Sequence, residues 1–148
     1  MSGTVLAFDY GERYMGIAVG DIETGMAHPA GHYQARGDEE RYAQAEALVR
    51  EWRPSRLVVG LPLGAEGQEH LLTARARRFA RHLSARTGLR VDMVDERLSS
   101  AAAHEVLRAA GRGGRRHKNE THALAAQVIL QAYLDEAKIS RMDTSEKR

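Results

Sequence analysis

Residues 4–20 read TVLAFDYGERYMGIAVG, two apolar runs on either side of a short polar segment. The first run, Thr4–Asp9, and the second, Tyr14–Gly20, are rich in residues that favour β-strands. Only Tyr10–Arg13 lies between them, and so short a connection joins neighbouring antiparallel strands. The stretch therefore predicts a β-hairpin, and a further run at Met26–Tyr33 predicts a third strand that extends the hairpin into a meander.

After this meander the spacing of the apolar residues changes to that of helices, with two short strands between them. Arg56–Gly60 is typical of a buried parallel strand, and Arg90–Asp95 is predicted as the fifth strand. The predicted helices are Asp38–Trp52, with Asp38 as its cap, Glu69–Arg86, a helix that Ser99 or Ser100 caps, and a last helix from Asn119 to about Ala137. Three antiparallel strands followed by alternating helices and strands predict an α/β fold, with a mixed five-stranded sheet covered by helices.

Length and composition fit one globular domain of 148 residues, because 43% hydrophobic and 28% charged residues exclude an intrinsically disordered chain. Residues 1–137 are predicted to form the domain, and 138–148 a flexible C-terminal tail because they contain few apolar residues. The absence of cysteine excludes disulfides, thiolate metal sites and a cysteine nucleophile. Neither a membrane-spanning run nor a signal peptide is present, so we expect a cytoplasmic protein with no membrane partner.

The net charge is only +2, but the charges are unevenly distributed. Arg75–Arg86 contains five arginines and no acid, and Val106–Asn119 contains four arginines, one lysine and no acid. The acids concentrate in Asp38–Glu51. Two basic blocks in a nearly neutral chain indicate an anionic partner, with nucleic acid as the main candidate. The alternative is a solvated helix face and a basic loop.

Two of the predicted strands end in acids. Asp9 ends the first strand, where a carboxylate is costly unless it is paired or bound to a metal, and Gly11 and Gly16 leave backbone room for an anionic ligand. Strand alternation sends Asp95 and Glu96 to opposite sides of the fifth strand, so one of them can face the same crevice. The alternatives are a turn-initiating Asp and a solvated charged turn. Carboxylates at two strand ends can bind Mg²⁺ or Mn²⁺ and support phosphodiester cleavage.

With these motifs, the chain resembles the YqgF/RuvX family of the RNase H-like superfamily, whose members are described as Holliday junction resolvases or pre-16S rRNA nucleases. The resemblance covers residues 5 to about 134 and implies an RNase H-like fold. It rests on Ala7–Gly11 with Gly16–Gly20, on Val58–Leu63, on Thr73–Ala80, on Asp95–Ser99 and on Ala125–Gln131.

The resemblance assigns the catalytic, metal-binding acids to Asp9 and Glu96. At the position of the family's third acid, an Asp, this chain has His122. His122 leads an apolar stripe of the last helix, so we expect it to face the sheet and complete the site. An imidazole binds Mn²⁺ better than Mg²⁺, which favours Mn²⁺ as the cofactor. The alternative is a core histidine, with Glu120 as the third acid.

The implied function is a metal-dependent nuclease for structured nucleic acid, with 5′-end processing of pre-16S rRNA as its reaction. Resolution of four-way DNA junctions is the alternative within the family and would require a homodimer rather than a monomer. A nucleic-acid-binding module with weak catalysis is the third hypothesis. An ATPase of the same superfamily would need a duplicated domain, which 148 residues cannot supply. The expected phosphate contacts are Arg75, Arg97, Arg115, Arg116 and Lys118.

Overall fold

Five strands form one mixed sheet in the order β3-β2-β1-β4-β5 in the computed structural model. The structure describes residues 3–96 and 118–146, and in 118–121 and 138–146 it describes the backbone only. The strands are β1 (Thr4–Tyr10), β2 (Tyr14–Asp21), β3 (Met26–Gln34), β4 (Arg56–Leu61) and β5 (Arg90–Asp95). The β1–β2 and β2–β3 pairs are antiparallel, whereas β1–β4 and β4–β5 are parallel. The predicted meander and mixed sheet are confirmed, and β1 lies at the centre.

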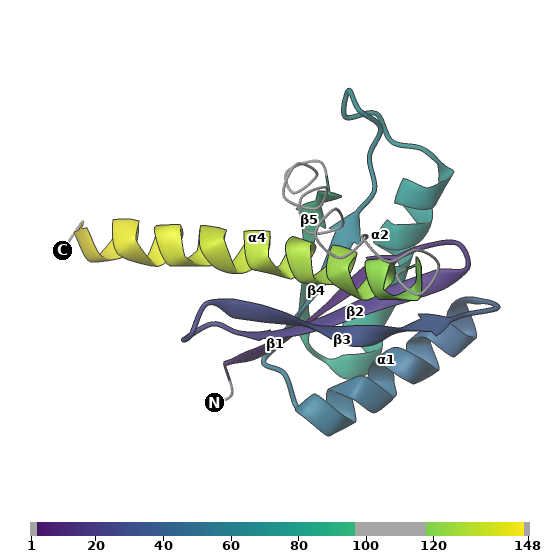
Figure 1. Cartoon of the computed structure of the whole chain (residues 1–148), viewed down its shortest axis with the longest axis horizontal. Coiled ribbons are helices and arrows are strands. Elements are labelled where there is room, and N and C mark those ends of the chain that lie inside the picture. The colour runs from purple at the N-terminus through teal and green to yellow at the C-terminus, as the bar shows by residue number, and fades with distance from the viewer. Residues whose placement is uncertain (1–2, 97–117, 147–148) are drawn as a thin grey trace.

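Helices cover both faces of this sheet (Figure 1). Helices α1 (Asp38–Trp52) and α2 (Leu71–Thr87) pack on one face, and α4 (Lys118–Glu146) crosses the other. Successive side chains of a strand point to opposite faces. Leu6, Phe8 and Tyr10 of β1 belong to the core under α1 and α2, while Val5 and Ala7 belong to the core under α4. The same alternation directs Asp9 toward α4.

The structure corrects the starts of the first two helices. Gly37 precedes α1, and Asp38 is the first helical residue instead of a side-chain cap. Its carboxylate instead accepts a hydrogen bond from Tyr10 of β1. Helix α2 begins at Leu71, two residues later than predicted, because His70 caps it and the His70 amide donates to the Thr73 hydroxyl. At its end Gly88 adopts φ 72°, a left-handed conformation that glycine tolerates best.

Helix α4 continues to Glu146, beyond the predicted end near Ala137. Residues 138–146 contain neither glycine nor proline, so the sequence has no strong helix breaker there. The helix predicted after Ser99 or Ser100 lies outside the described residues. Of the helices that the structure describes, none has the length and apolar character needed to cross a membrane.

Two glutamines attach α4 to the edge strand β3. Gln127 Nε2 donates to the Ala27 carbonyl at 3.0 Å. Gln131 accepts from the Ala27 amide at 3.1 Å and donates to the Gly25 carbonyl at 2.8 Å. Backbone groups of an edge strand need partners when they lie beside apolar surface, and these amides supply them. The contacts fix α4 over the sheet, with its first turn beside Asp9.

Candidate active site

The centre of the site is a pair of carboxyl groups at the ends of β1 and β5. Asp9 and Glu96 are hydrogen-bonded to each other through their side chains. Glu96 follows β5 directly and, two residues after the buried Val94, points to the same face of the sheet as Val94. The sequence predicted that one of Asp95 and Glu96 faces the crevice, and the structure brings Glu96 to Asp9.

Gly60 of β4 provides the space in which Glu96 reaches Asp9. Strand β4 lies between β1 and β5, and Gly60 pairs with Val94. A Cβ atom at position 60 would lie 2.8 Å from Glu96 Oε1 and 2.7 Å from Ile129 Cδ1. Any side chain there would push Glu96 or α4 away. In the sequence, Gly60 stands out only as part of a family motif, which does not reveal that it makes room for Glu96.

Gly16 and Gly11 have a different role from the one predicted. Gly16 pairs with Asp9, but a Cβ atom there would collide with the His122 carbonyl oxygen. A Cβ atom on Gly11 would lie 2.6 Å from the Tyr14 carbonyl oxygen. The backbone room beside Asp9 is therefore filled by the chain itself. Gly16 lets the first turn of α4 approach the sheet, and Gly11 lets the turn after β1 close tightly.

The electrostatics of the carboxyl pair favour a shared proton. Burial raises the pKa of Asp9, although the hydrogen bond from Glu96 and the charge of His122 lower it in part. Burial also raises the pKa of Glu96 to about 9, and the hydrogen bond to Asp9 and the charges of Asp9 and Asp95 act in the same direction. Two carboxylates this close cannot both ionise cheaply in a buried site. The pair therefore holds a proton at neutral pH when no cation is bound.

This donor set fits a hard divalent cation. Carboxylate oxygens are preferred ligands of Mg²⁺ and Mn²⁺, and a cation between Asp9 and Glu96 would replace the shared proton. The space at Gly60 leaves the Glu96 side chain free of obstruction by β4. Within residues 3–96 and 122–137, no group of three or more His, Cys, Asp or Glu is placed to hold an ion. The described site thus supplies a pair of acidic ligands.

His122 lies in the first turn of α4, as predicted, and its ring is part of an aromatic cluster beside Asp9. The ring stacks on Tyr14 at 4.7 Å between centroids, and the His32 ring lies 6.1 Å from it. Burial lowers the pKa of His122, and the charge of Asp9 opposes that shift. The imidazole is therefore neutral at pH 7. Its part in metal binding remains a prediction, and the side chain of Glu120 lies outside the description.

The sequence motifs did not point to His32 or Tyr14 as neighbours of the carboxyl pair. The strand register explains their position. His32 pairs with Gly16, and Gly16 pairs with Asp9, so the three residues form one row across the sheet. Tyr14 lies two residues before Gly16 and shares its face. A register prediction for the meander is the signal that could have found both residues.

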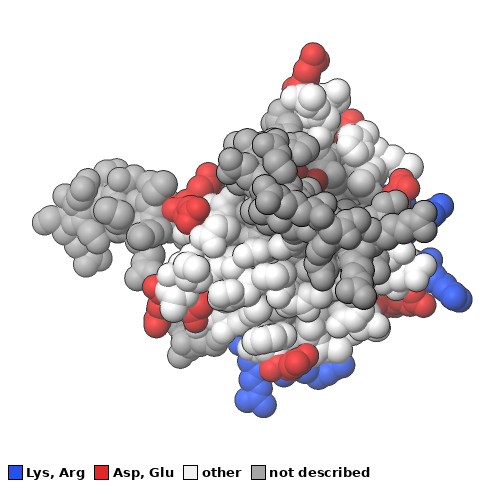
Figure 2. All heavy atoms as spheres, in the orientation of Figure 1, with Lys and Arg blue, Asp and Glu red and all other residues white. Residues whose placement is uncertain are grey.

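Most of the described basic block on α2 is neutralised within the molecule. Arg77 pairs with Glu69 at 2.7 Å, and Arg86 pairs with Glu39 of α1 at 3.0 Å. Arg78 pairs with Asp38 at 3.2 Å. On the face that Figure 2 presents, described Lys and Arg side chains lie at the rim beside acidic ones. Two of these arginines pair with acids of α1, so much of the charge of this predicted basic block is neutralised within the molecule.

Arg75 differs from these neighbours. It is half-buried, its guanidinium carbon lies 5.8 Å from the centroid of the Tyr10 ring, and it forms no ion pair within the described part of the chain. Because Tyr10 and Asp9 point to opposite faces, Arg75 approaches β1 from the face opposite the carboxyl pair. Arg97, Arg115 and Arg116 lie outside the described residues, as does the side chain of Lys118.

The chain is similar to known proteins over most of its length. A model of the family described as "RuvX: Holliday junction resolvase" matches residues 3–136. A protein of Methylobacillus flagellatus named "Putative pre-16S rRNA nuclease" is 47% identical over 133 residues, which cover 90% of this chain and 91% of that protein. A protein of the same name from Neisseria gonorrhoeae is 44% identical, with 90% and 88% covered.

Solved structures show the same fold at low sequence identity. RuvC of Thermus thermophilus, in a complex with a Holliday junction substrate, has a TM-score of 0.62 at 16% identity, with 95% of this chain and 96% of that chain covered. The Holliday junction resolvase of fowlpox virus has a TM-score of 0.57 at 7% identity, with 90% and 99% covered. The predicted RNase H-like fold is therefore confirmed.

Proposed function

The chain belongs to the RuvX family of Holliday junction resolvases, and on that premise we propose that it is a divalent-metal-dependent nuclease with its active site at Asp9 and Glu96. The observation that carries the proposal is the partly buried pair of carboxyl groups that hydrogen-bond to each other at the ends of β1 and β5. Ionisation of both carboxyl groups is unfavourable unless a cation joins them, so the pair favours a metal site over a structural one.

Each residue of the site has a part in the proposed reaction. Asp9 and Glu96 would hold Mg²⁺ or Mn²⁺ through their oxygens. When bound, the cation supplies Lewis-acid stabilisation of the charge that develops on the phosphodiester oxygens. His122, whose ring lies beside Asp9, is the proposed third ligand, and its imidazole would favour Mn²⁺. Gly60 keeps β4 out of the space that the substrate phosphate and the cation must share.

We further propose that pre-16S rRNA is the substrate and that cleavage matures its 5′ end. The support is the name of relatives that are 47% identical over nine-tenths of this chain. Arg75, a phosphate contact predicted from the sequence, stays available for that role, whereas its neighbours Arg77 and Arg78 pair with acids. From their charge in the sequence, Arg97, Arg115, Arg116 and Lys118 would contact further phosphates.

Resolution of four-way DNA junctions is the second candidate, favoured by the description of the matching family. The two reactions place different demands on the protein. A junction presents two strands for symmetric cleavage, so it needs two active sites and therefore a homodimer. A single strand at an rRNA end needs one site. Oligomeric state on the substrate thus separates the two candidates.

The test is a matched panel of substrates with purified protein in Mg²⁺ and in Mn²⁺. The panel holds an RNA with the pre-16S 5′ extension, a mature-end RNA, a single-stranded DNA and a four-way junction. We expect metal-dependent cleavage of the extended RNA, none in chelator and none by Asp9→Asn. Preferred cleavage of the junction by a dimer would favour resolution. Tight binding of RNA without cleavage in either metal would instead support the nucleic-acid-binding module.

A further inference from the structure

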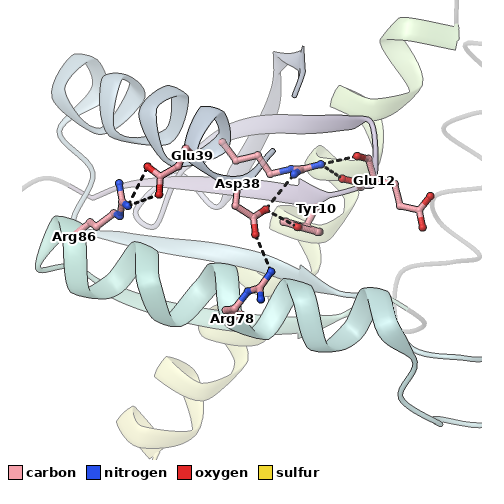
Figure 3. A network of polar contacts seen from close by, with 8 residues as sticks. Tyr10, Glu12, Asp38, Glu39, Arg78 and Arg86 are labelled. Carbon is pink, nitrogen blue, oxygen red and sulfur yellow. Dashed lines mark hydrogen bonds and ion pairs between the residues drawn. The ribbon is translucent and has the colours of Figure 1, made fainter. Parts of the chain in front are cut away.

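Arg41 of α1 is the most deeply buried charged side chain of the described residues, with 1% of its surface exposed. Its Nη1 atom donates to Asp38 at 3.1 Å, and its Nη2 atom donates to the carbonyl oxygens of Gly11 at 2.6 Å and Glu12 at 2.8 Å (Figure 3). Its guanidinium carbon lies 4.5 Å from the centroid of the Tyr10 ring. Arg41 therefore contacts each of the three residues that follow Asp9.

Those three residues form the turn by which the chain leaves the carboxyl pair. Gly11 is so close to the Tyr14 carbonyl that a Cβ atom would not fit, and the Arg13 carbonyl accepts from the Ala35 amide at 2.9 Å. With Arg41 on the Gly11 and Glu12 carbonyls, three successive carbonyl groups of the turn have fixed partners. A turn that is held at every residue fixes the end of β1 and with it the direction of Asp9.

Stability alone does not explain an arginine at this position. Burying a guanidinium is costly, and the Nε atom of Arg41 has no hydrogen-bond partner among the described residues. Buried ion pairs can often be replaced by apolar residues of similar volume with no loss of stability. Only an arginine can hold two carbonyl oxygens and a carboxylate at once with a planar fork of donors.

We propose that Arg41 is a positioning residue for the nuclease, which acts through the turn 10–12 to hold Asp9 where it meets Glu96 and the cation. The inference rests on the proposed function, because it assigns Arg41 a role in that same site. Removal of Arg41 should therefore weaken metal binding and slow the reaction, and it should leave the affinity for nucleic acid unchanged.

The network provides a matched control, because Asp38 bonds to Tyr10, Arg41 and Arg78 but to none of the turn carbonyls. Asp38→Asn removes the charge and leaves the Arg41 bonds to Gly11 and Glu12 in place. Arg41→Met removes those bonds and keeps an apolar stem of similar length. Arg41→Lys keeps the charge without the fork. If Arg41 only stabilises the fold, Asp38→Asn should be at least as harmful as Arg41→Met.

The experiment measures kcat, KM and the Mn²⁺ concentration for half-maximal rate on the extended RNA, well below each variant's melting temperature. We expect Arg41→Met to lower kcat about tenfold or more, as small displacements of catalytic groups do, with an unchanged KM and a higher Mn²⁺ requirement. Arg41→Lys should be intermediate, and Asp38→Asn should keep its kcat. A wild-type kcat and Mn²⁺ dependence in Arg41→Met would overturn the proposal, as would a parallel loss in Asp38→Asn.

Calorimetric titration of Mn²⁺ into the same four proteins separates this inference from the proposed function. If the wild-type protein cleaves no substrate, the proposed function fails and the titration decides on Arg41. Weaker Mn²⁺ binding by Arg41→Met with unchanged binding by Asp38→Asn supports the positioning role. Equal affinity in wild-type protein and Arg41→Met overturns it, and so does the absence of Mn²⁺ binding by the wild-type protein.

Discussion

The two faces of the sheet shift the pKa of a partly buried acid in opposite directions. On the face of α1 and α2, burial alone would raise the pKa of Asp38, but hydrogen bonds from Tyr10 and Arg78 and the charge of Arg41 bring it below its usual value. On the face of α4, burial and the charges of its neighbours raise the pKa of Glu96 to about 9. The carboxylate of Asp38 is stabilised by arginines of the chain, whereas the proposed partner of Asp9 and Glu96 is a cation from outside.

This difference separates structural acids from functional ones. Folding supplies Asp38 with every partner it needs, so the network around it needs no ligand. Asp9 and Glu96 lie together in the α4 face, where their mutual repulsion is a cost to the fold. Unfavourable charge pairs of this kind are found at functional sites, where a bound ligand stabilises them. The proposed active site lies on the α4 face, and four experiments test whether the two faces differ in this way.

The largest expected effect is the loss of cleavage when the carboxyl pair is changed. Asp9→Asn and Glu96→Gln preserve shape and remove one ligand charge each. We expect cleavage to fall about 10²-fold or more, roughly 3 kcal/mol of transition-state stabilisation, with nucleic-acid binding retained. The isosteric change on the other face, Asp38→Asn, should retain activity. Single-turnover rates in both metals measure the contrast, and near-wild-type cleavage by Glu96→Gln would refute the site.

The second effect concerns His122, where the chain departs from its family. A neutral imidazole favours Mn²⁺, whereas an all-oxygen shell favours Mg²⁺. We expect higher rates with Mn²⁺ than with Mg²⁺ in the wild-type protein. His122→Asp should shift the preference toward Mg²⁺, and His122→Ala should slow cleavage with both ions. Rates of the three folded proteins in both metals are the measurement.

The rival interpretation, a core histidine, gives a different result. His122→Ala would then lose the stack on Tyr14 and lower the melting temperature, with an unchanged ratio of Mn²⁺ to Mg²⁺ rates. His32→Ala is the matched control, because His32 belongs to the same aromatic cluster but lies on β3. A change of metal preference in His122→Ala alone would support a ligand.

The third effect is a pair of opposite pH dependences in metal-free protein. Folded Glu96 keeps its proton up to a pKa of about 9, whereas the unfolded group releases it near 4.5, so its contribution to stability is complete below 4.5 and is lost as the pH rises toward 9. Glu96→Gln should therefore become steadily more stable than wild type over that range. Because the pKa of Asp38 is lowered on folding, its charge stabilises the folded protein above pH 3.8 and not in strong acid. Asp38→Asn should therefore lower the free energy of unfolding most above pH 3.8.

Chemical unfolding of the three proteins in chelator, from pH 3 to 9, measures both slopes. As the pH rises, Glu96→Gln should gain stability relative to wild type, whereas Asp38→Asn should lose stability relative to wild type. Slopes of the same sign would mean that the two faces do not differ as the structure indicates. Added Mn²⁺ should remove the Glu96→Gln advantage, because the cation stabilises the wild-type pair.

The sequence predicted what depends on local pattern. Two apolar runs with a short connection in residues 4–20 predicted the hairpin, and the acids at two strand ends predicted that Asp9 and one of Asp95 and Glu96 face one crevice. The family resemblance then assigned Glu96. What it missed depends on tertiary distance. The backbone of α4 fills the space beside Gly16, and this contact becomes visible only when the helix is packed on the sheet. The position of His32 beside Asp9 depends on the register between β2 and β3, which shifts between Ile17 and Ala18.

The charged blocks show the same limit. Arg86 is 47 residues from Glu39 in sequence, and Arg78 is 40 residues from Asp38, yet each pair is in contact. A count of charges along the chain cannot reveal that α1 and α2 lie side by side. The basic block of α2 therefore looked like a docking surface for an anion, although three of its arginines pair with acids within the protein.

The smallest expected effect tests what is left of that surface. Arg75 forms no ion pair within the described residues, whereas Arg77 pairs with Glu69, so the two arginines are one helical half-turn apart but differ in free charge. In the Asp9→Asn background, Arg75→Ala should weaken binding evenly across sequences and reduce the slope of log K against log salt by about 1 on duplex and about 0.7 on single strands. Arg77→Ala should change the slope less, because Glu69 already neutralises that charge.

Filter binding between low and moderate salt measures both slopes. Equal slopes for the two variants would mean that Arg75 contacts no phosphate and only packs on Tyr10, which a lower melting temperature of Arg75→Ala would then reveal.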